Sequence, residues 1–213
     1  MKKIVLCLSL LMMCVGAFAQ DAAAAPKTKA KKAAAAATPP PMAMKMDVTS
    51  VLERNLKALE NDIVPAADAM PEDKFNFKPT NDLIKGSEFT GVKTYADQVK
   101  HIAVTNELIV ACLNGQPQPV PDAESDLGPA KLTSKADIMQ YLKDSFTHAH
   151  EAFAKINKAN IDGQVRNPFG KGTRPRLGLL IIILGHTQDH YGQMVEYLRM
   201  NGIIPPASRP PAK

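Results

Sequence analysis

The sequence predicts an all-α protein, most simply a four-helix bundle. Four segments of the 213-residue chain repeat their apolar residues at steps of three and four, which is the spacing of a buried helix face. Prolines and glycines separate these segments. No segment has a convincing strand pattern, and no internal repeat is visible. Helices of this number and length bury their apolar faces most simply against one another.

The first 19 residues are predicted to be a secretory signal peptide. Lys2 and Lys3 precede an apolar run from Ile4 to Val15, and the small residues Ala17 and Ala19 favour cleavage after Ala19. The run is shorter than the roughly 20 residues that span a bilayer, which disfavours a membrane anchor. A lipoprotein signal at Cys14 is the weaker alternative. We therefore expect an exported protein, periplasmic or secreted, with no transmembrane segment after cleavage.

Residues 20–45 are predicted to be a disordered linker, because they are almost entirely Ala, Lys, Pro and Thr. The folded domain is expected over residues 46–207, followed by a short tail at 208–213. Seven of the 26 Lys and Arg and one of the 21 Asp and Glu precede residue 46, which leaves 19 basic against 20 acidic residues. The net charge of +5 thus comes from outside the domain, and nucleic-acid binding is not expected.

The first two helices are expected near residues 48–64 and 94–113. The first is predicted to end at Pro65, and its apolar stripe is Val48, Val51, Leu52, Leu56, Leu59 and Ile63. A connection with several prolines and glycines follows. The second helix is expected to stop at the Asn114-Gly115 pair.

The last two helices are expected over residues 134–158 and 175–201. Thr133 or Ser134 is the predicted N-cap of the third helix. Pro175 suits the first turn of the fourth, which should end at Gly202. Residues 177–184 are apolar on all sides, so this helix is expected to be the central one.

Two histidines on the fourth helix suggest a metal site. His186 and His190 are four residues apart, so both imidazoles lie on one face and can chelate one ion. The spacing also fits simple packing. His101 is a candidate third ligand on the second helix, or else a single core histidine. His148 and His150 lie about 200° apart on the third helix, so they cannot share an ion and are expected to be exposed.

At these residues the chain resembles a known family. LGHTQDHYGQMVEYLRMNGIIPPAS resembles the C-terminal signature of the DinB family of bacterial metal-binding four-helix proteins. TYADQVKHIAVTNELIVACLNG resembles that family's second helix with its single ligand histidine, and MPEDKFNFKPT resembles the connection after its first helix. The resemblance covers residues 48–207. It implies that His101, His186 and His190 bind one divalent ion, commonly zinc or nickel, in an up-down-down-up bundle that is often a homodimer.

Three histidine ligands leave a coordination position open for water or substrate, which favours reactivity. The preferred hypothesis is a metal-dependent hydrolase or transferase acting on a small molecule; the alternative is a non-catalytic periplasmic metal-binding or interaction module. Peptidase activity is not expected, because H-E-x-x-H needs Glu where this chain has Thr187. The residues expected to orient the ligands or line the site are Asp97, Glu107, Asp189 and Gln193, with Tyr191 a further candidate.

Overall fold

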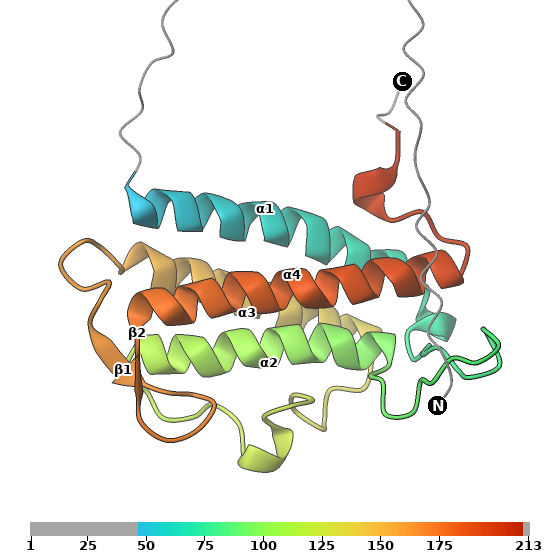
Figure 1. Cartoon of the computed structure of the whole chain (residues 1–213), viewed down its shortest axis with the longest axis horizontal. Helices are drawn as coiled ribbons and strands as arrows, with labels where there is room; N and C mark the ends of the chain where they lie inside the picture. Colours follow the sequence, from blue (N-terminus) through green and yellow to red (C-terminus); the bar gives the residue numbers. More distant parts are fainter. Residues whose placement is uncertain (1–46, 211–213) are drawn as a thin grey trace, which may run out of the picture. The chain divides into compact units, whose positions relative to one another are not determined.

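A computed structural model describes residues 47–210, so the predicted signal peptide and linker lie outside the described residues. The described residues fall within one unit of the chain, Met44–Lys213. They form four long helices, a two-stranded sheet and three short 3₁₀ helices (Figure 1): α1 (Val48–Ala69), η1 (Glu72–Lys74), α2 (Tyr95–Leu113), η2 (Asp122–Glu124), α3 (Lys135–Ala154), β1 (Gln164–Arg166), β2 (Thr173–Pro175), α4 (Arg176–Met200) and η3 (Pro206–Ser208). No helix among residues 47–210 is long and apolar enough to cross a membrane.

Each long helix packs mainly on two others, so that the order around the bundle is α1, α3, α2, α4. Hydrogen bonds give the relative directions. The start of α3 meets the end of α1 where Lys135 Nζ donates to the carbonyl of Asp68. The end of α4 meets the start of α2 where the Tyr197 hydroxyl donates to the carbonyl of Lys93. These two pairs are therefore antiparallel, whereas α2 runs parallel to α3, as the contact between Lys155 and Asn114 at their C-terminal ends shows.

The most enclosed helix is α2, not α4. Fifteen of the 19 residues of α2 are buried, because the other helices cover one side and the long connections cover the other (Figure 1). The prediction that α4 is central was wrong in this respect, since Ile181 in its apolar run is 54% exposed. The apolar stripe of α3 is buried at Ile138, Leu142, Phe146, Ala149 and Phe153, and Ile156, just after the helix, is buried as well.

Helix α1 continues through Pro65 to Ala69, beyond its predicted end. Proline removes one backbone hydrogen bond, but Pro65 lies on the exposed face, where water can solvate the freed carbonyl. The following turn is held by the buried residues Ala66, Ala67 and Met70. In addition, the buried hydroxyl of Tyr95 donates a hydrogen bond to the Ala66 carbonyl at 2.6 Å. Tertiary contacts thus outweigh the local effect of the proline.

Two further differences from the prediction lie between α3 and α4. Ser134 caps α3 as expected, but the helix ends at Ala154 rather than Lys158. The side chain of Asn160 accepts from the backbone of Asn157 and donates to the carbonyl of Lys155, which competes with further helical bonds. Next comes an unpredicted antiparallel hairpin of β1 and β2. Its strands have three residues each, too few to show a two-residue period in the sequence.

The hydroxyl of Tyr95 provides a test of the α1 packing. Tyr95→Phe should lower the free energy of unfolding by about 1–2 kcal/mol, because the buried Ala66 carbonyl loses its donor. Tyr141→Phe is the matched control, since the Tyr141 hydroxyl is buried without a hydrogen-bond partner among the described residues. That change should be neutral or stabilising. Urea unfolding followed by circular dichroism measures both, and equal effects would contradict the assigned role of Tyr95.

Candidate metal centre

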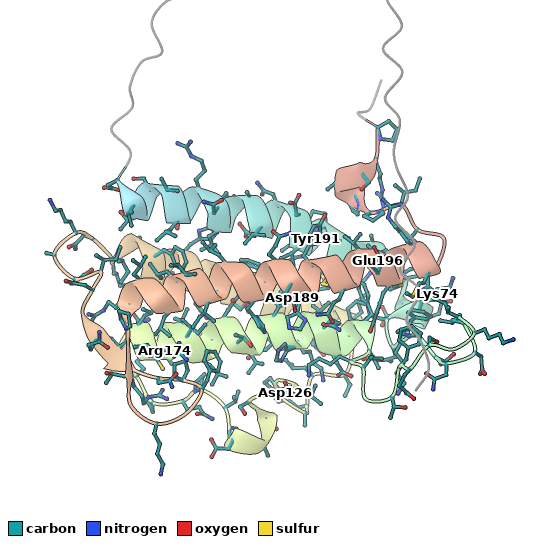
Figure 2. The ribbon with its side chains drawn as sticks, in the orientation of Figure 1. Lys74, Asp126, Arg174, Asp189, Tyr191 and Glu196 are labelled. Atoms are coloured by element: carbon teal, nitrogen blue, oxygen red, sulfur yellow. The ribbon has the colours of Figure 1, made fainter. Side chains whose placement is uncertain are left out.

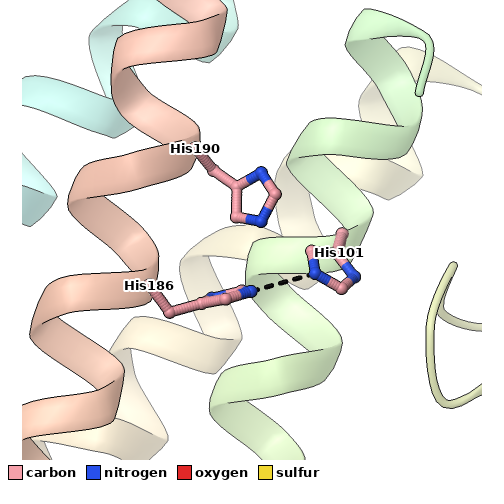
Figure 3. A group of neighbouring side chains, drawn as sticks. All are labelled: His101, His186 and His190. Atoms are coloured by element: carbon pink, nitrogen blue, oxygen red, sulfur yellow. Dashed lines mark hydrogen bonds between the residues drawn. The ribbon is translucent and has the colours of Figure 1, made fainter. Parts of the chain in front are cut away.

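Three histidines meet in the space between α2 and α4. His101 comes from the second turn of α2, which begins with a capping box formed by Thr94 and Asp97. His186 and His190 come from successive turns of α4. Because α2 and α4 are antiparallel, the first half of α2 lies beside the middle and second half of α4. The three side chains therefore point toward one another from two helices (Figure 3).

The three imidazoles are close enough to bind one ion together. One ring nitrogen from each histidine can be chosen so that all three lie within 4.8 Å of one another. The Nε2 atoms of His101 and His186 are 2.9 Å apart (Figure 3). The ring centroids are separated by 4.5 to 4.8 Å, in tilted or edge-on arrangements. Among the described residues, no other cluster of three histidine, cysteine or acidic side chains meets the same criterion.

Burial keeps these imidazoles neutral. It lowers the pKa of His186 to about 3 and that of His190 to about 4, with repulsion between the neighbouring rings as a second cause. The pKa of His101 is also lowered by burial. A neutral imidazole has one nitrogen lone pair free, which is the form that binds a metal. At neutral pH the cluster therefore offers three nitrogen ligands.

A chain of hydrogen bonds fixes the orientation of His190. Its Nδ1 lies 2.5 Å from Oε1 of Gln98. The amide nitrogen of Gln98 donates to Oε1 of Gln193 at 2.8 Å, and the amide nitrogen of Gln193 donates to Asp189 at 3.0 Å. A carboxylate only accepts, so the donor direction is set along the whole chain. Nδ1 of His190 is then the donor, and its Nε2 lone pair remains free.

A second contact orients His101. Its Nδ1 hydrogen-bonds to the backbone carbonyl of Asp126, and the Asp126 carboxylate lies 3.1 Å from the same nitrogen. Lys93 pairs with that carboxylate at 2.9 Å and lowers its pKa. Figure 2 shows Asp126 on the loop that runs along α2, on the side away from α1. The carbonyl makes Nδ1 the donor here as well, whereas Nδ1 of His186 is buried without a partner among the described residues.

Of the four residues expected to orient the histidines or line the site, two contribute to the hydrogen-bond chain of His190 and two bind other residues. Asp189 and Gln193 belong to the hydrogen-bond chain that reaches His190. Asp97 instead caps its own helix through Thr94. Glu107 binds His148 on α3 at 2.7 Å, away from the three histidines.

Two other histidines were predicted to be exposed, and this was right only for His148. His150 is half-buried between Glu53 and Glu60 of α1, because the packing of α3 on α1 brings these side chains together. Gln98 and Asp126 were not predicted as part of the site. Gln98 lies three residues before His101, so helical spacing could have indicated it. No periodic signal marks Asp126, which lies in a proline-rich loop.

A cavity of about 550 Å³ opens beside the histidines. His101 and His186 form one wall, together with Thr105 and Leu108 of α2. The rest of the lining comes from connections: residues 125–126 after η2 and residues 168–170 at the tip of the β1–β2 hairpin. This volume suits a small molecule, since ligand pockets commonly measure about 300–1,000 Å³.

Comparison with known proteins identifies relatives of this arrangement. The model of the DinB superfamily matches residues 55–194, which include all three histidines. A crystal structure of a DinB-like protein from Bacillus cereus ATCC 10987 superposes with a TM-score of 0.56 at 16% identity, covering 73% of this chain and 93% of that one. A conserved protein from Enterococcus faecalis gives a TM-score of 0.55 at 16% identity, covering 73% and 97%. No curated protein matches the chain.

The lowered pKa values predict how stability depends on pH in metal-free protein. The unfolded chain binds protons at its histidines below about pH 6.5, while folded His186 and His190 stay neutral to about pH 4. The unfolded state thus binds more protons, so stability should fall as pH falls, by up to about 4 kcal/mol between pH 7 and pH 5, about 2 kcal/mol from each of the two histidines. Exposed His148, whose pKa is raised by Glu107, opposes this weakly.

Urea unfolding at a series of pH values in the presence of a chelator measures this dependence. The double variant His186→Gln with His190→Gln is the control, because it removes both buried imidazoles and should lose most of the slope. A wild-type free energy of unfolding that is constant from pH 7 to pH 5 would contradict the burial of neutral rings.

Proposed function

The chain belongs to the DinB superfamily, and from this premise we propose that His101, His186 and His190 bind one divalent metal ion, zinc or nickel, which serves a reaction on a small molecule. The reaction we favour is hydrolysis, with group transfer as the related possibility. The observation that carries the proposal is the cavity, which has two of the three histidines in its wall. A metal held there would be accessible to a substrate.

The donor set fits such an ion. Zinc–nitrogen bonds of about 2.0–2.1 Å at tetrahedral angles separate two ligand nitrogens by about 3.3 Å. The observed separations, from 2.9 Å for one pair to at most 4.8 Å, lie on either side of this value. Three neutral imidazoles also suit zinc and nickel better than calcium or magnesium, which prefer oxygen ligands.

The surroundings favour an open coordination position over a closed structural site. Structural zinc sites have four protein ligands, whereas catalytic ones have three and leave room for water or substrate. Each acidic residue expected near the ligands has another partner: Asp97 caps α2, Glu107 pairs with His148, and Asp189 accepts from Gln193. None of them joins the three histidines in the ligand cluster. This supports a catalyst rather than a metal store.

The ion would supply Lewis acidity and lower the pKa of a bound water or thiol. The protein's own residues then have separate tasks. Gln98 and the Asp126 carbonyl hold two ligand rings with their lone pairs toward the centre. The Asp126 carboxylate, ionised beside Lys93, can accept a hydrogen bond from a substrate in the cavity. Hydrolysis needs only water as the second reactant, which is why we prefer it for an exported protein. Export itself is proposed from the N-terminal sequence alone.

Elemental analysis tests the metal site. The chain from residue 20 onward, purified without a histidine tag, should contain about one zinc or nickel per chain. His186→Ala with His190→Ala should lose it, because a single remaining imidazole cannot retain the ion. The matched control is His148→Ala with His150→Ala, which removes two histidines outside the cluster and should keep the metal. Metal-free protein after reconstitution would overturn the proposal and leave a helical binding module.

Gln98 tests the orientation of the ligands. Gln98→Leu should weaken metal binding roughly 10- to 100-fold, because His190 loses the acceptor that holds its Nδ1 as the donor. Competition against a chromogenic chelator measures the dissociation constant. Gln140→Leu, on the exposed face of α3, is the control and should leave metal affinity unchanged. An unchanged constant for Gln98→Leu would show that the hydrogen-bond chain has no influence on the site.

A further inference from the structure

The tip of the β1–β2 hairpin places an exposed aromatic side chain at the cavity beside the three histidines. Phe169 is 49% exposed, although most large apolar residues in the bundle are buried. It lines the same cavity as His101 and His186. An aromatic ring at the wall of a cavity, partly in contact with solvent, is able to bury further area when a ligand enters.

The position of Phe169 is held by its own loop. The side-chain oxygen of Asn167 accepts hydrogen bonds from the backbone nitrogen of Phe169 and from Arg174 on β2. The backbone nitrogen of Asn167 donates to the carbonyl of Gly172, which closes the loop at its base. Gly172 has φ = +84°, a conformation that favours glycine. The loop is thus organised before any ligand binds, and the exposure of the ring is built into the hairpin.

The remaining walls have few charges. No lysine or arginine is among the described residues that line the cavity. The one carboxylate in the lining belongs to Asp126. The other lining side chains are neutral imidazoles, hydroxyls and apolar groups. Lys93 contacts Asp126, but its ammonium group already forms an ion pair with the Asp126 carboxylate. A negatively charged group at the far end of a ligand would find no cationic partner there and would face the carboxylate.

From these features we propose that Phe169 selects the substrate. The substrate is a small molecule with a metal-binding oxygen or sulfur group at one end. Its other end is an uncharged apolar group about the size of a ring. The polar end lies at the histidines and the apolar end contacts Phe169 and Leu108. This inference rests on the proposed metal site. It adds the class of substrate and the residue that recognises it.

Hydroxamates serve as probes, because they provide a metal-binding head with a variable substituent. Isothermal titration calorimetry on the full zinc-loaded protein compares acetohydroxamate, benzohydroxamate and 4-carboxybenzohydroxamate. Benzohydroxamate should bind about tenfold more tightly than acetohydroxamate, since the phenyl ring buries additional apolar area. The 4-carboxy derivative should lose most of this gain.

Variants then assign the gain to Phe169. Phe169→Ala should bring benzohydroxamate close to acetohydroxamate in affinity while leaving acetohydroxamate unchanged, and Phe169→Leu should restore part of the difference. Leu83→Ala, which truncates an exposed apolar side chain in the connection between α1 and α2, should change neither. The side chain of Phe169 is half-exposed, so its truncation should not unfold the protein, and circular dichroism checks this.

The outcomes separate this inference from the proposed function. If the protein retains zinc and binds acetohydroxamate, but the phenyl group adds no affinity or the Phe169 variants keep the full gain, the metal site stands and the role of Phe169 is overturned. Equal affinity for the carboxylated probe would overturn the exclusion of anionic groups. If zinc is not retained, the proposed function and this inference both fail.

Discussion

The antiparallel packing of α2 against α4 is the constraint on which the candidate site depends. It places His101 opposite His186 and His190, which are 85 and 89 residues further along the chain. A partly buried hydrogen bond between Gln98 and Gln193 joins the same two helices next to the histidines. This bond fixes the register, because a shift of one residue on either helix turns the ligand side chains away by about 100°.

The parts that the sequence predicted are those with a local signal. The His186 and His190 pair follows from a four-residue spacing on one helix, and Ser134 is the predicted N-cap of α3. The resemblance to the DinB family added His101, which spacing alone left open as a core histidine. The sequence therefore predicted the three-histidine cluster and the four helices, apart from the ends of α1 and α3.

The parts that could not be predicted depend on contacts between distant segments. Helix α1 passes Pro65 because Tyr95, from another helix, binds the Ala66 carbonyl. Asp97 is on the same face as His101 and was a reasonable partner for it, but the cap at Thr94 already uses its carboxylate. The Asp126 carbonyl reaches His101 from a loop of irregular backbone, and a backbone carbonyl has no residue-specific sequence signal. Strands of three residues are likewise too short to produce a recognisable sequence pattern.

The division of the site between helices and connections has a physical consequence. The three histidines and Gln98 lie on packed helices, where a substitution disturbs the core, so the positions of the imidazole nitrogens are strongly constrained. The rest of the cavity lining comes from residues 125–126 and 168–170, which lie in surface connections that tolerate change. Phe169 is half-exposed and lies in a hairpin tip, so many substitutions at this position should leave the bundle intact. The lining of the cavity can therefore change on this scaffold while the arrangement of the three histidines stays the same.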